Sequence, residues 1–240
     1  MSNFNKMRTK HLTYLNFLGH SLIAKHGLYS KIALFSHYAH GELLDVGCGT
    51  KPYLPLFEQR VKHYTGLDFS KTAGKRIDHA DVVGDATKLP FRVSTFDTIL
   101  STEVIEHIPE PAKALSEMYR VLRPGGYLIL SAPLFWPLHE EPHDFYRYTK
   151  FGLNYLLKSA GFSIKETGDT TGFFETVGQL FAYGLYLKYG QNSGTIIRKV
   201  IILGCIFIQT FFILLGLIFG KFGDSLSTVI VARKLKTNRL

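Results

Sequence analysis

The sequence predicts an α/β fold, in which a mostly parallel sheet carries helices on both of its faces. Two observations predict it. Four short apolar runs follow one another between residues 42 and 103, and each leads into an acidic residue. Residues 122–131 then give the end of a helix, a Pro-Gly-Gly turn and a fifth strand. Polar residues at strand ends are typical of such sheets, because ligands bind outside the carboxyl ends of the strands.

The first strand and its turn form the most informative segment. Residues 42–49 read Glu-Leu-Leu-Asp-Val-Gly-Cys-Gly, so an apolar strand runs into a turn that carries Asp45, Gly47 and Gly49. Glycine has no Cβ, which lets the turn adopt unusual dihedral angles and lets a ligand approach the backbone. A helix that begins near Tyr53 would direct its free N–H groups at that ligand. The segment predicts a nucleotide-cofactor site, but it lacks the third glycine of a pyrophosphate-binding Gly-x-Gly-x-x-Gly motif.

Three further predicted strands also end in an acidic residue. Asp68 follows Asp45 by about 20 residues, the spacing at which a second strand offers a carboxylate to ribose hydroxyls. Asp85 ends the third strand and Glu103 follows the fourth. A single acidic residue at a strand end is typical of a helix cap or a turn. Four in this order, however, each lie where the crevice of a parallel sheet would use them.

With these motifs the chain resembles a class I S-adenosylmethionine-dependent methyltransferase of the group that methylates small molecules. The resemblance covers residues 42–162, and residues 227–234 resemble the antiparallel last strand of that Rossmann-like, seven-stranded sheet. It implies S-adenosylmethionine as the cofactor. The implied cofactor-binding residues are Asp45, Gly47 and Gly49 around the methionine part with Cys48 between them, Asp68 at the ribose, Asp85 and the Ala86 backbone at the adenine amine, and Glu103 facing both cofactor and substrate.

The charge of the expected cofactor agrees with these residues. A sulfonium cofactor is cationic and has no phosphate, so its ammonium, sulfonium and hydroxyl groups need carboxylates and not a lysine-bearing phosphate loop. One departure from the family pattern is Lys51-Pro52, where glycine is usual. The Lys51 side chain must therefore point away from the cofactor. Cys48 is interpreted as a small apolar residue to which no chemistry is assigned.

Two segments after the fourth and fifth strands are candidates for substrate chemistry. The first places Glu106 beside His107, and His107 is the first candidate for a general base, against the alternative that it only holds the turn. The second, residues 132–148, is rich in aromatic residues, histidines and charges and is interpreted as a substrate lid. Its His143 is the other candidate base. Methyl transfer would then proceed by in-line displacement, with the acid or base supplied by these two loops.

The lid contains a formal match to a zinc-protease motif. Residues 139–143 read His-Glu-Glu-Pro-His, but Pro142 would break the helix that such a motif requires. The sequence therefore predicts no metal site. The preferred interpretation is that His143, Asp144, Tyr146 and Arg147 gather around an acceptor, with Arg147 suited to an anionic group. The alternative is that the charged lid residues pair only with each other.

The C-terminal part adds apolar material to this domain. Residues 200–220 contain no charge and are long enough to span a membrane, but the strand at 227–234 must return to the same sheet. Residues 172–189 are apolar and aromatic but carry Glu175, Gln179 and Lys188, which is typical of an interfacial helix. The sequence thus favours a helical hairpin in one leaflet, inserted before the last strand. The alternative is that these helices bury against each other or in a dimer interface.

Composition indicates where the protein works. The formal net charge is +9 and the pI is about 9.4, which favours contact with anionic lipid, while no nucleic-acid module is recognisable. The settings of Cys48 and Cys205 do not suit a disulfide between them, which indicates a reducing compartment. Residues 1–10 are polar and show no secretory signal. We expect a cytoplasmic domain attached to the cytoplasmic face of the membrane, and the oligomeric state stays open.

These patterns divide the chain into an N-terminal helical segment (1–40), a methyltransferase domain (41–171 with 224–240) and an apolar helical insertion (172–223). Apolar residues at helical spacing predict one or two helices in the N-terminal segment, which we expect to cover the mouth of the site. These residues are Leu12, Leu15 and Leu18 and then Leu22, Ile23, Leu28, Ile32 and Phe35. The predicted function is methyl transfer to a small-molecule, lipid or lipid-linked acceptor. A non-catalytic protein of the same fold that binds S-adenosylmethionine or serves as a membrane scaffold is the alternative, and a nicotinamide-linked reductase is disfavoured by the missing glycine.

Overall fold

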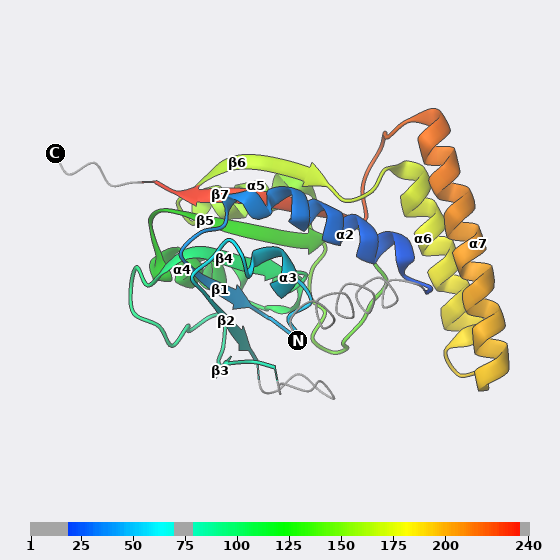
Figure 1. Cartoon of the computed structure of the whole chain (residues 1–240), viewed down its shortest axis with the longest axis horizontal. Helices are drawn as coiled ribbons and strands as arrows, with labels where there is room; N and C mark the ends of the chain where they lie inside the picture. The colour runs from blue at the N-terminus through cyan, green and yellow to red at the C-terminus, as the bar shows by residue number, and fades with distance from the viewer. Residues whose placement is uncertain (1–18, 70–78, 236–240) are drawn as a thin grey trace, which may run out of the picture. The chain divides into compact units, whose positions relative to one another are not determined.

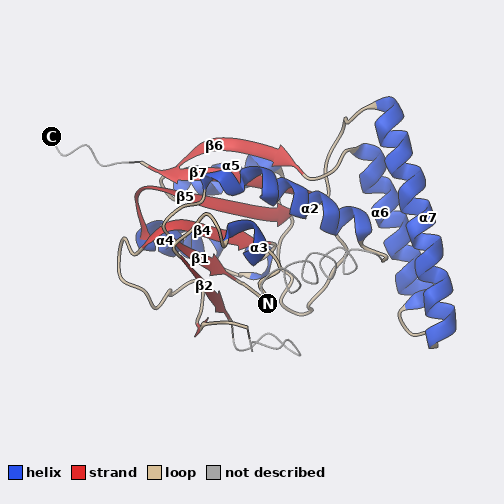
Figure 2. Ribbon diagram, viewed as in Figure 1, coloured by secondary structure: helices blue, strands red, loops and turns tan. Residues whose placement is uncertain are grey.

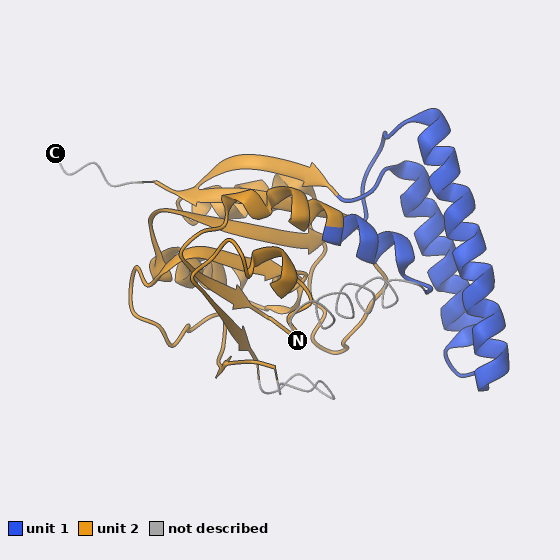
Figure 3. Cartoon of the chain, viewed as in Figure 1, with its two compact units in different colours: residues 1–29, 170–226 blue, residues 30–169, 227–240 orange. Residues whose placement is uncertain are grey.

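The computed structural model describes residues 19–69 and 79–235, which form two compact units (Figure 3). The sheet unit comprises Ser30–Asp169 and Ser227–Leu240, and the hairpin unit comprises Met1–Tyr29 and Thr170–Leu226. The helix predicted around Leu12, Leu15 and Leu18 lies outside the described residues.

The sheet unit contains one seven-stranded sheet, and this confirms the predicted α/β fold (Figure 1). The strand order is β3-β2-β1-β4-β5-β7-β6. Strands β1 to β5 pair in parallel, while β7 runs antiparallel to both β5 and β6, as predicted for the last strand. The strands are β1 (Glu42–Val46), β2 (His63–Asp68), β3 (Val82–Val83), β4 (Phe96–Thr102), β5 (Leu122–Pro133), β6 (Phe162–Asp169) and β7 (Ser227–Lys234).

Helices connect the strands and cover both faces of the sheet (Figure 2). The helix expected near Tyr53 does begin there, but it has only four residues, and none of them lines the cavity described below. The helical elements of this unit are the C-terminal part of α2 (Leu22–Phe35), α3 (Leu54–Phe57), α4 (Pro111–Val121), α5 (Lys150–Ser159) and the 3-10 turns Ser36–Tyr38 and Ile105–His107.

The main core lies between the sheet and helices α4 and α5. Side chains alternate along β1, so Leu44 and Val46 join this core while Leu43 and Asp45 point to the other face. That other face is covered by α2 and α3 (Figure 2). The helices contribute the buried side chains Leu115, Met118 and Val121 of α4, Leu153 and Leu157 of α5, Ile32 and Phe35 of α2 and Phe57 of α3.

The hairpin unit is built on two helices that pack against each other, α6 (Phe173–Leu185) and α7 (Thr195–Phe219). Residues Tyr186–Gly190 extend α6 by a π-helical turn. Within the described residues, α7 is the one helix long and apolar enough to cross a membrane, with a mean hydropathy of 2.7. Only 17% of its most apolar segment is buried. Both helices precede β7 in the chain, as the sequence predicted.

Two buried glutamines bind the start of α2 within the hairpin unit. Gln209 of α7 accepts the N–H of Ile23 at 3.0 Å and donates to the carbonyl of Gly19 at 3.0 Å. Gln179 of α6 accepts the N–H of Ala24 at 3.1 Å and donates to the carbonyl of His20 at 2.8 Å. The first N–H groups of a helix have no partner inside it. These amides therefore satisfy polar groups that an apolar helix pair would leave unpaired.

Replacing Gln209 with leucine removes these bonds but keeps the apolar volume. We expect the Ile23 amide hydrogen to exchange about 10- to 100-fold faster, because an unpaired buried group costs about 1–3 kcal/mol. Hydrogen exchange in one detergent buffer, read by mass spectrometry, measures this. The matched control is Thr210→Val, which removes an exposed hydroxyl from the next position of α7. Equal exchange in both variants would contradict the capping role of Gln209.

Candidate functional site

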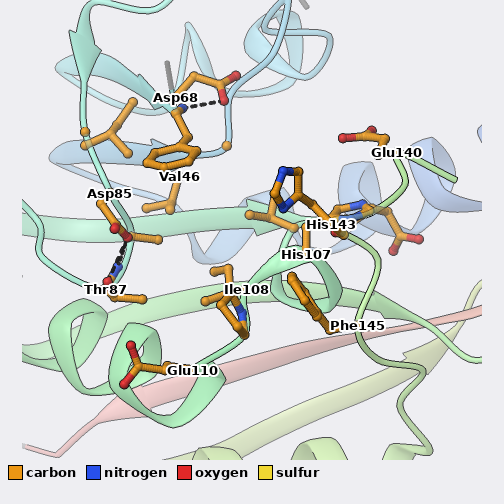
Figure 4. Close-up of a pocket in the computed structure, with 18 of the residues that line it drawn as sticks. Val46, Asp68, Asp85, Thr87, His107, Ile108, Glu110, Glu140, His143 and Phe145 are labelled. Atoms are coloured by element: carbon orange, nitrogen blue, oxygen red, sulfur yellow. Dashed lines mark hydrogen bonds between the residues drawn. The ribbon is translucent and has the colours of Figure 1, made fainter. Parts of the chain in front are cut away.

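A cavity of about 460 Å³ opens at the carboxyl ends of β1, β2 and β4 in the sheet unit (Figure 4). Among residues 19–69 and 79–235, its wall holds five carboxylates and two imidazoles and no lysine or arginine. The potential inside is therefore negative, which suits a cationic ligand. The acidic lining residues are Asp68, Asp85, Glu103, Glu110 and Glu140, the imidazoles are His107 and His143, and the glycine-turn residues are Gly47 and Gly49.

The glycine turn after β1 lies against the end of β2 and the loop after β4. Gly47 has a φ of 76°, and a Cβ on it would lie 2.3 Å from Cγ2 of Val104. Its N–H donates to the carbonyl of Leu67 at 2.8 Å. The N–H of Gly49 donates to Oδ2 of Asp68 at 2.8 Å. Glycine is thus required at position 47, both for its backbone angle and for the close approach of the β4 loop.

Lys51 points away from the cavity, as the interpretation of the turn required. Its Nζ pairs with Oδ2 of Asp81 at 2.6 Å, and it is not among the lining residues. Gly66 makes room for this arrangement, since a Cβ there would lie 2.5 Å from Cε of Lys51. The departure from the family pattern at Lys51 therefore places no ammonium group in the cavity.

Asp45 and Cys48 lie beneath the turn and do not line the cavity. The Tyr64 hydroxyl donates to Oδ2 of Asp45 at 2.5 Å, while Oδ1 has no hydrogen-bond partner among the described residues. Burial raises the pKa of Asp45 to about 7. Burial likewise raises the pKa of the Cys48 thiol to about 12, which keeps it protonated. The structure thus separates these two predicted cofactor residues from the open space of the site.

Asp68 and Asp85 do line the cavity, at the ends of β2 and β3 (Figure 4). The N–H of Phe69 donates to Oδ1 of Asp68 at 2.7 Å. Both the N–H and the hydroxyl of Thr87 donate to Oδ1 of Asp85, at 2.7 and 2.8 Å. A carboxylate has about four acceptor positions, so both side chains keep capacity for a ligand. Ala86 also lines the cavity, so the two residues predicted to bind the adenine amine lie side by side in its wall.

Glu103 lines the cavity from a strained position after β4. Its φ is 52°, a backbone angle that is uncommon for residues other than glycine. Oε1 accepts the Ser131 hydroxyl at 2.7 Å and Oε2 accepts the Ser227 hydroxyl at 3.1 Å. Burial raises the pKa of Glu103 above its ordinary value. The hydrogen bonds from β5 and β7 hold this carboxyl at the base of the cavity.

Glu106 and His107 follow in a 3-10 turn, but they occupy different environments. Glu106 is fully buried, and in the described part of the chain neither carboxylate oxygen has a hydrogen-bond partner. Burial raises its pKa well above the ordinary value, and the nearby Glu103 adds to the rise. His107 lines the cavity, and its Nδ1 donates to the carbonyl of His143 at 2.7 Å. Only the imidazole therefore reaches the open space.

The lid residues pair mainly with each other. Both oxygens of Asp144 accept hydrogen bonds from Arg147, at 2.6 and 2.7 Å, and this pairing holds the pKa of Asp144 well below its usual range. Arg147 also donates to the carbonyls of Trp136 and Pro137. The hydroxyl of Tyr146 donates to a backbone carbonyl at 3.0 Å. The expected gathering of Asp144, Tyr146 and Arg147 around an acceptor is therefore not what the structure shows, because their polar groups hold the loop together outside the cavity.

Several cavity residues were missed by sequence reasoning. Phe69 directly follows Asp68, and Thr87 directly follows Ala86. Their position next to predicted site residues could have identified them. Glu110, Glu140 and Phe145 come from loops whose path the sequence does not define. His139 lies outside the cavity lining, but its ring centroid is 4.7 Å from that of His107. Burial, and then the nearby His107, lower the pKa of His139 from its ordinary value.

Comparisons with known proteins bear on the family. A family described as "Methyltransferase domain" matches residues 44–130. A "Probable S-adenosylmethionine-dependent methyltransferase" of Mycolicibacterium smegmatis is 30% identical over 57% of this chain and 56% of its own length. A phosphatidylethanolamine N-methyltransferase of Cereibacter sphaeroides is 36% identical over 38% of this chain and 49% of its own length. The chain thus spans about half the length of these curated relatives.

Among solved structures, the [4+2]-cyclase SpnF is similar in fold. It superposes with a TM-score of 0.58 at 22% identity, covering 88% of this chain and 82% of its own. That likeness concerns the fold and not the reaction. Residues 44–130 thus match a methyltransferase domain, and they lie in a seven-stranded sheet whose last strand alone is antiparallel, so this part of the chain is similar to class I S-adenosylmethionine-dependent methyltransferases.

Proposed function

We propose that the cavity binds S-adenosylmethionine and that the chain transfers its methyl group to a lipid or lipid-linked small molecule at the membrane surface. The observation that carries the proposal is the wall of the cavity, whose described residues include five carboxylates and neither lysine nor arginine. A phosphate-bearing dinucleotide would meet repulsion there, whereas a sulfonium ligand with an ammonium group and ribose hydroxyls meets acceptors. The cofactor of the family and the charge of the site therefore agree.

The lining residues divide between the parts of this cofactor. Asp68 at the end of β2 would accept the ribose hydroxyls, and Asp85 with the Ala86 backbone would bind the adenine amine. The backbone at Gly47 and Gly49 would face the methionine part. Asp45 would act from beneath the turn, by fixing β1 to β2 through Tyr64, and Cys48 by filling space.

The proposed reaction needs little covalent help from the protein. When bound, S-adenosylmethionine supplies a methyl carbon activated by positively charged sulfur. The cavity residues align the acceptor and exclude water, and a base takes the acceptor proton. We assign the base to His143, whose exposed imidazole lines the cavity. His107, the first candidate from the sequence, positions His143 by donating to its carbonyl, and Glu106 is too buried to reach the acceptor directly.

The hairpin unit supports a membrane-bound acceptor. One side of α7 exposes apolar residues at helical spacing, and a continuous exposed apolar surface is typical of an interaction or membrane site. A relative named for phosphatidylethanolamine methylation fits the same class of acceptor. We therefore propose that residues 172–223 attach the methyltransferase domain (41–171 with 224–240) to the membrane, while residues 1–40 form the adjoining helical segment. The exposed residues of α7 include Val200, Leu203, Phe207, Phe211, Leu214 and Ile218.

The positions of the cations favour a hairpin that lies flat in the cytoplasmic leaflet. Lys188, Arg198 and Lys199 lie where the chain turns from α6 to α7, and Lys221 lies at the opposite end of α7. Insertion with the turn leading would carry three cations into hydrocarbon, which is costly. At about 37 Å, α7 is long enough to span the bilayer, yet a full crossing would place those cations on the outer side. A flat orientation keeps all four at headgroup level.

A non-catalytic cofactor-binding protein of the same fold is the competing function. It shares the binding site but needs no base and no acceptor. The imidazoles in the cavity wall favour the enzyme, because a binding protein has no use for them. Turnover with lipid extracts and a labelled methyl donor separates the two functions.

Asp68→Asn should weaken S-adenosylmethionine binding by about 10- to 100-fold, since it removes charge-assisted hydrogen bonds worth about 1.5–3 kcal/mol. Isothermal titration calorimetry measures the affinity. Glu58→Gln, which removes an exposed carboxylate outside the cavity, should bind like the wild type. Binding of a nicotinamide dinucleotide in place of S-adenosylmethionine would refute the assignment.

His143→Gln should lower the rate of methyl transfer to a lipid extract by about 10²- to 10⁴-fold, the usual contribution of a general base. Its affinity for S-adenosylmethionine should stay close to that of the wild type, because the imidazole acts on the acceptor. His63→Gln, on an exposed strand end, is the matched control. An unchanged rate in His143→Gln would contradict this assignment and would favour His107 as the base.

Leu203→Glu with Phe207→Glu should abolish flotation with vesicles that contain anionic lipid, because two charges would enter the apolar interface. The matched control places the same charges on exposed aromatic residues of the sheet unit, Phe151→Glu with Tyr155→Glu, and should still float. A wild-type protein that stays in solution as a defined dimer would support the alternative of a buried interface and overturn membrane attachment.

A further inference from the structure

We propose that Glu106, His107 and His139 bind a single divalent transition-metal ion, with zinc as the best match. The site goes beyond the proposed methyl transfer, and it adjoins the cavity because His107 lines the cavity wall. The sequence alone predicted no metal here. Its His-Glu-Glu-Pro-His motif pairs His139 with His143, whereas the fold brings His139 to a different histidine and to a buried carboxylate.

The three candidate ligands converge from two loops. One ligand atom from each of Glu106, His107 and His139 lies within 4.8 Å of the others. Nε2 of His107 is 3.7 Å from Oε1 of Glu106, and the two imidazoles meet edge to face at an interplanar angle of 76°. Two ligands about 2.0–2.1 Å from a tetrahedral zinc ion lie roughly 3.3 Å apart, so modest side-chain rotations would close the site.

Each histidine has an acceptor beside its Nδ1. Because a carbonyl can only accept, the bond from His107 to His143 places the His107 proton on Nδ1 and leaves Nε2 with a free lone pair. Nδ1 of His139 lies 3.2 Å from Oδ2 of Asp144, within ion-pair distance although not aligned as a hydrogen bond. Asp144 is itself fixed by Arg147. A backbone carbonyl and a carboxylate are the partners that metal-bound histidines usually have.

The environment of the Glu106 carboxylate supports a bound cation independently of the distances between the ligand atoms. It is fully buried, and within residues 19–69 and 79–235 neither of its oxygens has a hydrogen-bond partner. An unpaired carboxylate in such a place is costly unless a proton or a cation neutralises it. The imidazole of His107 is too far away for a hydrogen bond, since its Nε2 lies 3.7 Å from Oε1 of Glu106. A bound cation would satisfy both oxygens.

The ligand types define the class of ion. Two imidazoles and one carboxylate suit zinc, and also iron or nickel, better than magnesium or calcium, which prefer oxygen ligands alone. Three protein ligands leave a coordination position open for water or an acceptor oxygen. The use of that position by an acceptor rests on the proposed function, but the binding of the ion does not.

Zinc binding to the full chain tests the inference directly. Protein freed of metal by a chelator should take up one Zn²⁺ per chain in competition with a chromophoric chelator. Glu106→Gln and His139→Gln should each weaken binding by at least about 100-fold, and Asp144→Asn by about 10- to 100-fold as an outer partner. X-ray absorption should show nitrogen and oxygen ligands near 2.0–2.1 Å and no sulfur near 2.3 Å, which excludes binding to Cys48 or Cys205.

The matched control is His63→Gln, since His63 and Glu42 form an exposed histidine–carboxylate pair at 3.0 Å, and its zinc affinity should equal that of the wild type. Far-ultraviolet circular dichroism and thermal unfolding check that each variant folds. Failure of the wild type to retain zinc, or equal affinity in His139→Gln, would overturn the metal site. Cofactor binding without zinc binding would leave the proposed function intact, whereas zinc binding without cofactor binding would refute only the function.

Discussion

The burial of carboxylates at the carboxyl edge of the parallel sheet is the constraint on which the site depends. A carboxylate removed from water is costly unless it is hydrogen-bonded or paired with a cation. The fold meets this cost differently at three positions. Asp45 is bonded by Tyr64, Glu103 is bonded by Ser131 and Ser227, and Glu106 has no hydrogen-bond partner among the described residues. The carboxylates at this edge give the cavity a negative potential. Such a potential suits a sulfonium cofactor in the cavity and a metal ion beside it.

The sheet keeps that potential intact by directing cations elsewhere. Lys51 lies in the turn nearest the cavity, yet its ammonium group is held by Asp81, and Gly66 leaves space for its stem. Arg147 lies in the lid, yet its guanidinium group is occupied by Asp144 and three backbone carbonyls. The same pairing orders the loop that brings His139 to His107. Charge pairing in the loops therefore serves both the cavity and the neighbouring cluster.

The hairpin unit distributes polarity in the opposite way to a soluble domain. Its amides Gln179 and Gln209 are fully buried, while Leu203, Phe207 and Phe211 of α7 are exposed. The buried amides hydrogen-bond to the backbone at the start of α2. The exposed side chains of Leu203, Phe207 and Phe211 are apolar and form no hydrogen bonds. In a lipid environment this distribution is favourable, since interhelical amides hold the helices together while apolar side chains meet acyl chains.

The sequence by itself determined the strands, the glycine turn, the apolar hairpin and the presence of Asp68, Asp85 and Glu103 at one edge, because periodicity and turn chemistry act over a few residues. It did not determine which side chains meet. Only the tertiary structure buried Asp45 under the turn, paired Arg147 with Asp144 and joined His139 to Glu106. Those contacts depend on how distant loops pack at the sheet edge, and no local pattern records the path of a loop.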